Sequence, residues 1–375
     1  MRSFIHLVLL SLVLLEAFSE EVLQSDSDLV LVQVLWRHGA RAPKAMKFFV
    51  PPGINASDWP RGLGQLSDKG IKEQYRLGQF LRSRYGSLIE NYSPQKVYAR
   101  SGDADRALMS AEACLAGTFP DQPWTSPLGM SWQPIPVHGV PKPYDTMLYL
   151  SDSNCPGQKR KDIFSYLSPK NVTTLWPEYA DVVAYVEEKS GLKIKNSLDL
   201  FNIYDILSTY RSHNVAAVLP TWATDQVFTA LKNANEEATA YYHNHELFRL
   251  LRKSELFSDL AQRMQNKANG SSNSGEQYIA YSAYGTTVRA LLADWHIYTP
   301  QMTPSVSACI MVELHKRSTG DHFVKILYRN RGELKVLSIP GCDGEECPLE
   351  RFVGFAKKEA ARDMTEACRK LHEDS

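Results

Sequence analysis

With 375 residues, the chain is longer than a typical single domain, which predicts one large core with an insertion, or two domains. Its 42 Lys and Arg residues balance 42 Asp and Glu residues, and hydrophobic residues make up 43% of the chain, an ordinary globular composition. Because the chain has neither a basic excess nor a basic stripe, we expect no nucleic-acid partner.

The N-terminus has the features of a signal peptide over residues 1–19. Arg2 precedes an apolar run from Phe4 to Leu15, and the small-residue pattern Ala17-Phe18-Ser19 follows. This run is too short to cross a bilayer, and no later stretch reaches the roughly 18 apolar residues that a span needs. We therefore expect a secreted protein without a membrane span.

Modification sites agree with a secretory route. Asn-x-Ser/Thr sequons predict N-glycosylation at Asn55, Asn91, Asn171 and Asn269. The six cysteines allow up to three disulfides in an oxidising compartment, and their spacing matches no zinc-finger pattern. Cys342 and Cys347 bracket Asp-Gly-Glu-Glu, which predicts a locally closed turn.

The first predicted element is a strand that opens into a loop. Residues 29–36 form an apolar, β-branched run, which indicates a buried strand, and the loop follows at residues 37–43. Ser67 can cap a helix whose apolar face runs from Ile71 to Leu81. Together these segments predict a first β-loop-α unit.

Strands and helices continue to alternate further along the chain. A strand precedes a helix twice more, at 96–100 with 104–115 and, after a loop, at 278–283 with 288–295. This order predicts an α/β fold with a mostly parallel central sheet flanked by helices, in which ligands bind beyond the carboxyl ends of the strands. Three apolar runs between residues 309 and 339 predict an antiparallel extension.

The middle of the chain has a different pattern. Residues 136–270 combine amphipathic helices, such as 235–251, with Pro-bounded loops, so we expect a helical insertion there that would form a lid or substrate domain. The α/β core would then comprise residues 20–135 and 271–375. The polar stretch 269–275 is typical of a surface loop or domain junction.

The candidate reactive side chains lie in one loop, Arg37-His38-Gly39-Ala40-Arg41-Ala42-Pro43. Two guanidinium groups flank one imidazole, and arginine supplies the permanently charged, bidentate donors that a phosphate dianion needs. Flanking cations disfavour a protonated imidazole, so the His38 lone pair stays available to attack phosphorus. Gly39 would allow close backbone approach to the ligand, and Pro43 would stiffen the loop exit.

The sequence resembles the histidine acid phosphatases, in particular the prostatic and lysosomal type, whose hallmark is R-H-G-x-R-x-P after the first strand. Further similar stretches are WPRGLGQLSDKG from Trp59, VYARSGDADRALMSA from Val97, WQPIPVHGVP from Trp132, LPTWAT from Leu219, YSA from Tyr281 and CPLERF from Cys347. They cover nearly the whole mature chain in order. The resemblance implies the phosphoglycerate mutase-like histidine phosphatase fold, a homodimer, and a small phosphomonoester as ligand without a cofactor or metal.

The resemblance also implies site residues. His38 would be the phosphate-accepting nucleophile, and Arg37, Arg41 and Arg100 would clamp the phosphate. From the residues alone, Arg100 is better explained as an ion-pair partner of a nearby aspartate, Asp103 or Asp105.

The chain departs from the family in the last motif. The family has Tyr-Ser-Ala-His-Asp-Thr-Thr, where the His binds phosphate and the Asp protonates the leaving alcohol, whereas this chain has Tyr284 and Gly285 at those two positions. Gly285 has no side chain for either role, and a positioned proton donor is worth about 10² to 10⁴ in rate. Tyr284 could hydrogen-bond the phosphate or donate weakly, but space filling is the favoured role.

The cysteines resemble the family in part. Cys155 would pair with Cys368 and Cys342 with Cys347, while the family's partner for Cys309 falls at Thr209. A bond between Cys114 and Cys309 would keep the count even and is one hypothesis for these two residues.

Two functions remain open at this point. The first is a secreted or lysosomal phosphatase that forms a phosphohistidine and has weakened activity. The second is a non-catalytic secreted protein that uses the arginine clamp to bind phosphorylated ligands.

Overall fold

The computed structural model describes residues 27–44, 56–120, 132–149, 176–213, 219–251, 255–271 and 275–362, with two further positions at 365 and 369. Several expected features lie outside these residues: the signal peptide 1–19, the sequons at Asn55 and Asn171, and the pair Cys155–Cys368. The sequons at Asn91 and Asn269 lie on exposed residues.

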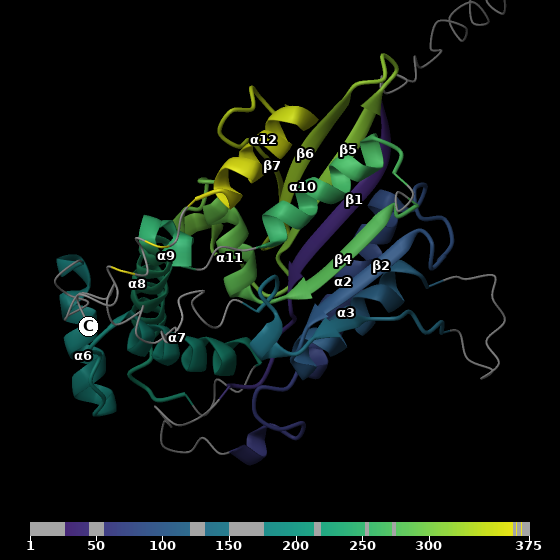
Figure 1. The fold of residues 1–375 in the computed structure, drawn as a ribbon. Coiled ribbons are helices and arrows are strands. Elements are labelled where there is room, and N and C mark those ends of the chain that lie inside the picture. The colour runs from purple at the N-terminus through teal and green to yellow at the C-terminus, as the bar shows by residue number, and fades with distance from the viewer. Residues whose placement is uncertain are drawn as a thin grey trace, which may run out of the picture.

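One mixed sheet of eight strands forms the centre of the described chain (Figure 1). Its strands are β1 (Ser27–Arg37), β2 (Val97–Gly102), β3 (His138–Val140), β4 (Tyr278–Ala283), β5 (Cys309–Arg317), β6 (His322–Asn330), β7 (Glu333–Leu337) and β8 (Cys347–Pro348). The order is β3-β2-β4-β1-β5-β6-β7, and β8 pairs with β6.

The sheet has a parallel half and an antiparallel half. Strands β3, β2, β4 and β1 are parallel, whereas β5 to β8 pair in antiparallel ladders. The α/β class and the antiparallel extension predicted over residues 309–339 are confirmed. The parallel pairing is confined to one half. Strand β6 follows β5, and β7 follows β6, through short connections that only an antiparallel pair allows.

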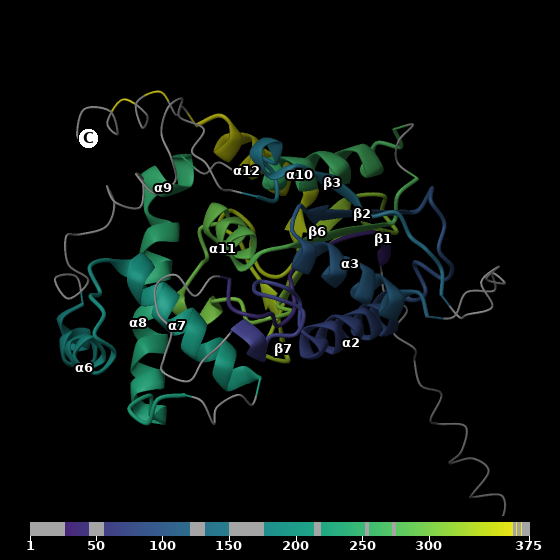
Figure 2. The same ribbon diagram turned by 90° about the horizontal axis from the view of Figure 1, so that it is seen from below.

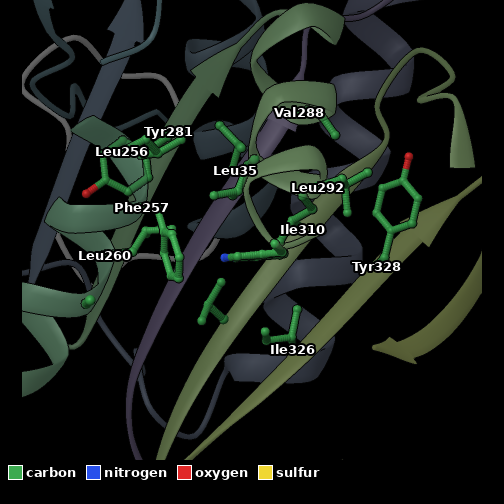
Figure 3. Packing of buried hydrophobic residues seen from close by; sticks show 14 of the residues in the cluster. Leu35, Leu256, Phe257, Leu260, Tyr281, Val288, Leu292, Ile310, Ile326 and Tyr328 are labelled. Atoms are coloured by element: carbon green, nitrogen blue, oxygen red, sulfur yellow. The ribbon is translucent and has the colours of Figure 1, made fainter. Parts of the chain in front are cut away.

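Helices cover both faces of the sheet, as the two views together show (Figures 1 and 2). On one face lie α2 (Asp68–Tyr85) and α3 (Asp105–Thr118), and on the other lie α10 (Glu255–Ala268), α11 (Gly285–Asp294) and α12 (Leu349–Ala360). Strand β1 contributes side chains to the apolar cores on both faces of the sheet, because alternate side chains of a strand point to opposite faces. Leu31 and Leu35 pack with α10 to α12, while Val34 and Trp36 pack with α2 and α3. Figure 3 shows Leu35 among side chains of α10 and α11.

A second group of helices lies beside the sheet (Figure 1). It contains α6 (Ala180–Ser190), α7 (Ser197–Ser212), α8 (Asp225–Asn244) and α9 (Glu246–Leu251). Helices α6 to α8 share a separate apolar core, which Trp59 joins from the β1–α2 connection. The helix predicted over 235–251 is two helices, α8 and α9, because the backbone of His245 is extended.

The expected insertion 136–270 holds two elements that belong to the sheet layers. Strand β3 pairs with β2, and α10 packs on the sheet face through Leu256, Phe257 and Leu260 (Figure 3). Helical periodicity alone does not distinguish a helix on the sheet from one beside it. None of the helices described is long and apolar enough to cross a membrane.

Candidate active site

The candidate site lies where three parallel strands end at the same edge of the sheet. In register, Arg37 of β1 is level with Ala283 of β4, and Ser101 of β2 is level with Ser282 of β4. Side chains from the segments after these strands line a cavity of about 530 Å³. This is the edge at which α/β sheets bind ligands.

His38 lines the cavity and is held in one tautomer. The ring is 3% exposed, and its Nδ1 lies 2.8 Å from the carbonyl oxygen of Gly39. A carbonyl oxygen only accepts hydrogen bonds, so Nδ1 carries the proton and Nε2 keeps its lone pair. The His38 backbone N–H donates to Ala283 at 3.0 Å, which fixes the residue against the end of β4.

The surroundings of His38 keep it neutral. Burial lowers the pKa of His38 well below the ordinary value, and the guanidiniums of Arg106, Arg37 and Arg41 lower it further, against a smaller opposing effect of the Gly39 hydrogen bond. A neutral imidazole with a free Nε2 is the form of histidine that can act as a nucleophile.

Arg37 and Arg41 both line the cavity. Burial and the nearby Arg289 and Arg41 lower the pKa of Arg37 to about 10, and its Nε–H is buried without an acceptor among the described residues. Arg41 is 6% exposed and pairs with Asp205 of α7 at 2.8 Å, so the helical group holds one residue of the predicted phosphate clamp.

Arg100 does not join this clamp, and the site assignment for this residue is corrected here. Its guanidinium pairs with Asp145 at 2.7 Å, and the residue is not part of the cavity lining. Arg106, in the first turn of α3, lies in the cavity instead and is the cation with the largest effect on His38. The ion pair supports the structural role of Arg100, with Asp145 as the partner rather than Asp103 or Asp105.

The loop that carries His38 is anchored to the start of α2. A Cβ on Gly39 would lie 2.5 Å from the carbonyl oxygen of Gly70, so glycine is needed here for close contact with the helix. We expected Gly39 to admit a ligand, and its closest neighbour is the helix backbone instead. Glu73 accepts a hydrogen bond from the Ala40 N–H at 2.9 Å, and Ser67, the N-cap of α2, donates to the Ala40 carbonyl.

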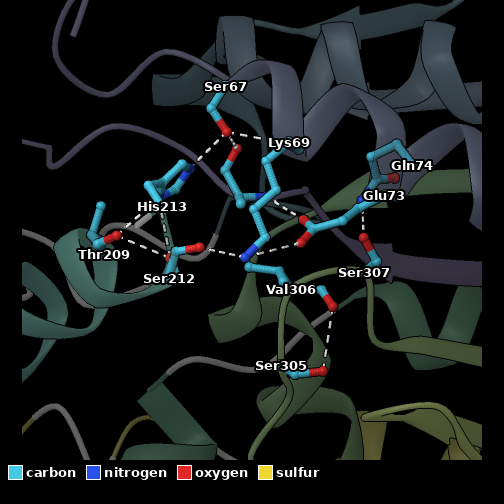
Figure 4. A network of polar contacts seen from close by, with 12 residues as sticks. Ser67, Lys69, Glu73, Gln74, Thr209, Ser212, His213, Ser305, Val306 and Ser307 are labelled. Atoms are coloured by element: carbon cyan, nitrogen blue, oxygen red, sulfur yellow. Dashed lines mark hydrogen bonds and ion pairs between the residues drawn. The ribbon is translucent and has the colours of Figure 1, made fainter. Parts of the chain in front are cut away.

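His213 links this anchor to the helical group (Figure 4). Its Nδ1 donates to the Thr209 carbonyl at 2.8 Å, and its Nε2 lies 2.7 Å from the Ser67 hydroxyl. Lys69 of α2 donates to the Ser212 carbonyl at the end of α7. The helical group therefore supports the His38 loop through α2 as well as through Asp205.

Tyr284 fills space next to His38. Its ring meets the His38 ring edge-on at 6.3 Å, and the Arg106 guanidinium lies over it at 5.2 Å. A Cβ on Gly102 would lie 2.7 Å from the hydroxyl, so Gly102 makes room for the ring. Burial raises the pKa of Tyr284, and its hydroxyl has no hydrogen-bond partner in the described structure, which fits the space-filling role.

Gly285 is the first residue of α11, so the loop that we expected before a helix at 288–295 is absent. Glycine is a weak helix former and conceals a helix start in the sequence. Arg289, one turn further along α11, is 6% exposed and reaches the cavity, and its Nε donates to the Gly285 carbonyl. The sequence analysis missed Arg289; its position four residues after Gly285 was the available signal.

Two carboxylates line the cavity and both have hydrogen-bond donors. Asp105 accepts from the Gln65 side chain at 2.7 Å, and Asp103 accepts from the Lys142 backbone N–H at 3.2 Å. The described residues contain no cluster of three His, Cys, Asp or Glu side chains that could hold a metal ion.

The cysteines follow the prediction at one pair and depart from it at another. Cys342 and Cys347 form the expected disulfide. Cys114 and Cys309 are both buried free thiols, so the bond considered between them is absent. Burial raises the pKa of both thiols, that of Cys309 to about 12, and a protonated thiol does not form disulfides readily.

Guanidinium groups at the carboxyl ends of parallel strands are suited to an anionic ligand such as a phosphoryl group. A profile of the histidine phosphatase superfamily (branch 2) matches residues 28–329, and the chain belongs to this superfamily. The resemblance inferred from the motifs is therefore confirmed.

Curated relatives are acid phosphatases. The chain is 35% identical over 354 residues to prostatic acid phosphatase from Homo sapiens, covering 91% of this chain and 88% of the relative. It is 33% identical over 361 residues to lysosomal acid phosphatase from Homo sapiens (91% and 80%) and 32% identical over 356 residues to putative acid phosphatase 5 from Caenorhabditis elegans (94% and 82%).

Solved structures share the fold at low sequence identity. The apo form of Hafnia alvei phytase matches with a TM-score of 0.69 at 15% identity, covering 92% of this chain and 98% of the phytase chain. Phytase from Citrobacter braakii matches with a TM-score of 0.68 at 16% identity, covering 91% and 99%.

Proposed function

We propose that the protein is an acid phosphatase that hydrolyses phosphomonoesters through a phosphohistidine at His38, with weakened activity toward alkyl esters. One observation carries this proposal: a neutral His38 with a free Nε2 lies in a cavity lined by four guanidiniums. Cationic side chains without counterions are costly to bury, so such a cavity is suited to an anion.

In the proposed reaction, Arg37, Arg41 and Arg106 hold the phosphate dianion. Nε2 of His38 attacks phosphorus, the N–P bond forms and the bond from phosphorus to the ester oxygen breaks. Water then cleaves the N–P bond and releases phosphate. The guanidiniums stabilise the negative charge on the transferring phosphoryl group. Positioning and electrostatic stabilisation account for most of the catalysis in phosphoryl transfer.

The structure offers no acidic side chain at position 285 to protonate the leaving ester oxygen. Gly285 carries no side chain, and the raised pKa of Tyr284 makes its phenol a poor proton donor. Alkoxides need a proton in order to leave, whereas aryl oxides leave without much assistance. The proposed enzyme therefore discriminates between esters by their leaving group.

Aryl phosphates should be hydrolysed with a kcat/KM at least about 10²-fold above that of glycerol phosphate, which is the lower end of the value of a positioned proton donor. Steady-state rates on the two substrates at one mildly acid pH measure this ratio. The His38→Ala variant should abolish turnover of both, while the matched variant His322→Ala, at the start of β6, should leave both rates unchanged. Equal rates on the aryl and alkyl esters would contradict the absence of a donor.

A non-catalytic phosphate-binding protein is the second candidate. The observation that favours it is Gly285, since the motif's acid is replaced by a residue without a side chain. This candidate is correct if the protein binds phosphate or vanadate and shows no turnover that His38→Ala removes.

Compartment and assembly are further parts of the proposal. The predicted signal peptide and the relatives named as prostatic and lysosomal acid phosphatases support a secreted protein, with the lysosomal lumen as the alternative. N-glycosylation at the four sequons, the Cys155–Cys368 bond and a homodimer remain predictions of the same kind.

A further inference from the structure

Arg289 is a cation that the phosphate clamp does not require. It lies on α11, one turn after Gly285, and is 6% exposed. Its Nε donates to the Gly285 carbonyl at 3.2 Å, and no carboxylate in the described part of the chain pairs with its guanidinium. Since a buried charge without a partner is costly, Arg289 is suited to a negative group that arrives with the ligand.

The space in front of Gly285 is flanked by two guanidiniums. A Cβ placed on Gly285 would lie 3.3 Å from Nη2 of Arg289 and 3.4 Å from Nε of Arg37. The Nε–H of Arg37 is buried and has no acceptor among the described residues. Two guanidinium nitrogens therefore lie next to the position where the family motif has an aspartate and this chain has no side chain.

The lining of the cavity is predominantly cationic. Six cationic side chains and two carboxylates line it, and Asp205 pairs with one of the six. The cationic residues are Arg37, Arg41, Lys44, Arg106, Lys142 and Arg289, and the carboxylates are Asp103 and Asp105.

We propose that Arg289 and Arg37 form a carboxylate subsite over Gly285, so that the preferred substrates are phosphate esters of hydroxy acids. This inference rests on the proposed phosphatase function and names its substrate class. A carboxylate fits because guanidinium groups bind it through paired N–H donors. An aspartate at position 285 would repel the same group.

The test compares two ligands that differ in one group. Glycerate 2-phosphate carries a carboxylate where glycerol 2-phosphate carries a hydroxymethyl group. Calorimetric titration of each into the full-length protein, at one ionic strength and at a pH where the carboxylate is ionised, should give about 10- to 100-fold tighter binding of the glycerate ester, the value of charge-assisted hydrogen bonds.

Three variants test which residues cause the tighter binding of the glycerate ester. Arg289→Gln should reduce the difference between the two esters at least about fivefold, by losing affinity for the glycerate ester alone. Gly285→Asp should also remove the preference, by repulsion, and does not depend on how Arg289→Gln folds. Lys335→Gln, which removes the same charge from an exposed residue of β7, should retain the full preference.

Suppose that inorganic phosphate binds to the protein. Equal affinities for the two esters, or a preference for the glycerate ester that survives both Arg289→Gln and Gly285→Asp, would then overturn the carboxylate subsite alone. If inorganic phosphate fails to bind as well, the proposed function itself is wrong. The phosphate titration therefore separates the two failures.

Discussion

A variant that restores the family motif and removes the competing cation, Tyr284→His with Gly285→Asp and Arg289→Ser, should hydrolyse alkyl phosphates about 10² to 10⁴ times faster than the wild type. The new aspartate would supply the proton that the leaving alkoxide requires. Aryl phosphates should gain much less, because their leaving groups need little protonation. Steady-state kcat/KM on glycerol phosphate and on an aryl phosphate measures both effects.

The same experiment includes two informative controls. The double variant Tyr284→His with Gly285→Asp should gain less than the triple variant, because the Arg289 and Arg37 guanidiniums next to position 285 hold the new carboxyl ionised. A triple variant with Gly285→Asn in place of Gly285→Asp has the same shape without an acidic proton, and it should show no gain. If the Asn and Asp forms gain equally, proton donation is not what the wild type lacks.

Exchanging Arg106 and Arg100 for glutamine should separate binding from stability. Arg106→Gln should weaken phosphate binding by about 10- to 100-fold, since it removes charge-assisted donors, and should leave thermal stability the same or higher because Arg41 repels Arg106. Arg100→Gln should leave phosphate affinity unchanged. It should destabilise the fold by about 3 to 5 kcal/mol, because the buried carboxylate of Asp145 loses its cationic partner.

Calorimetric phosphate titration and thermal unfolding of the two variants give these values. The reverse pattern, in which Arg100→Gln loses phosphate and Arg106→Gln does not, would restore Arg100 to the clamp. It would also remove the reason to place phosphate in the cavity beside Tyr284.

Local hydrophobic patterns in the sequence predicted the strands that border the candidate site. The run before Arg37 and the run 278–283 are buried on both faces, so apolar residues mark them continuously, and the structure places β4 at Tyr278–Ala283. The His38 loop follows directly from the end of β1. Its position at the sheet edge needed no information beyond strand order.

The assignment of the third arginine could not be made from local patterns. Arg100 is inside strand β2, where its side chain meets Asp145, a residue 45 positions away that no local pattern relates to it. Arg106 reaches the cavity because it is in the first turn of α3, directly beyond the end of β2. The direction of a helix relative to the sheet decides this, and that direction is a tertiary property.

Arg289 and the helical group show the same limit. The start of α11 at Gly285 contradicts intrinsic helix preference, so sequence reasoning placed a loop there and gave Arg289 no role. Asp205 is one of many acidic residues on amphipathic helices, and only packing of α7 against the His38 loop identifies it as the partner of Arg41.

The lowered pKa of His38 also affects stability. A histidine whose folded pKa is below its unfolded value of about 6.5 contributes stability that is present above that pH and is lost as the pH falls toward the folded pKa. Bound phosphate offsets the guanidiniums and should reduce this loss.

The protonation state of His38 tests the central claim most directly. NMR of the imidazole nitrogens across pH, with His38→Asn to identify the signals, should show a neutral ring protonated at Nδ1 at pH values well below about 6.5. Added phosphate should raise the pKa of His38, because the dianion lies next to the ring. A ring that becomes protonated near pH 6.5 and does not respond to phosphate would contradict a neutral nucleophile in a phosphate-binding cavity.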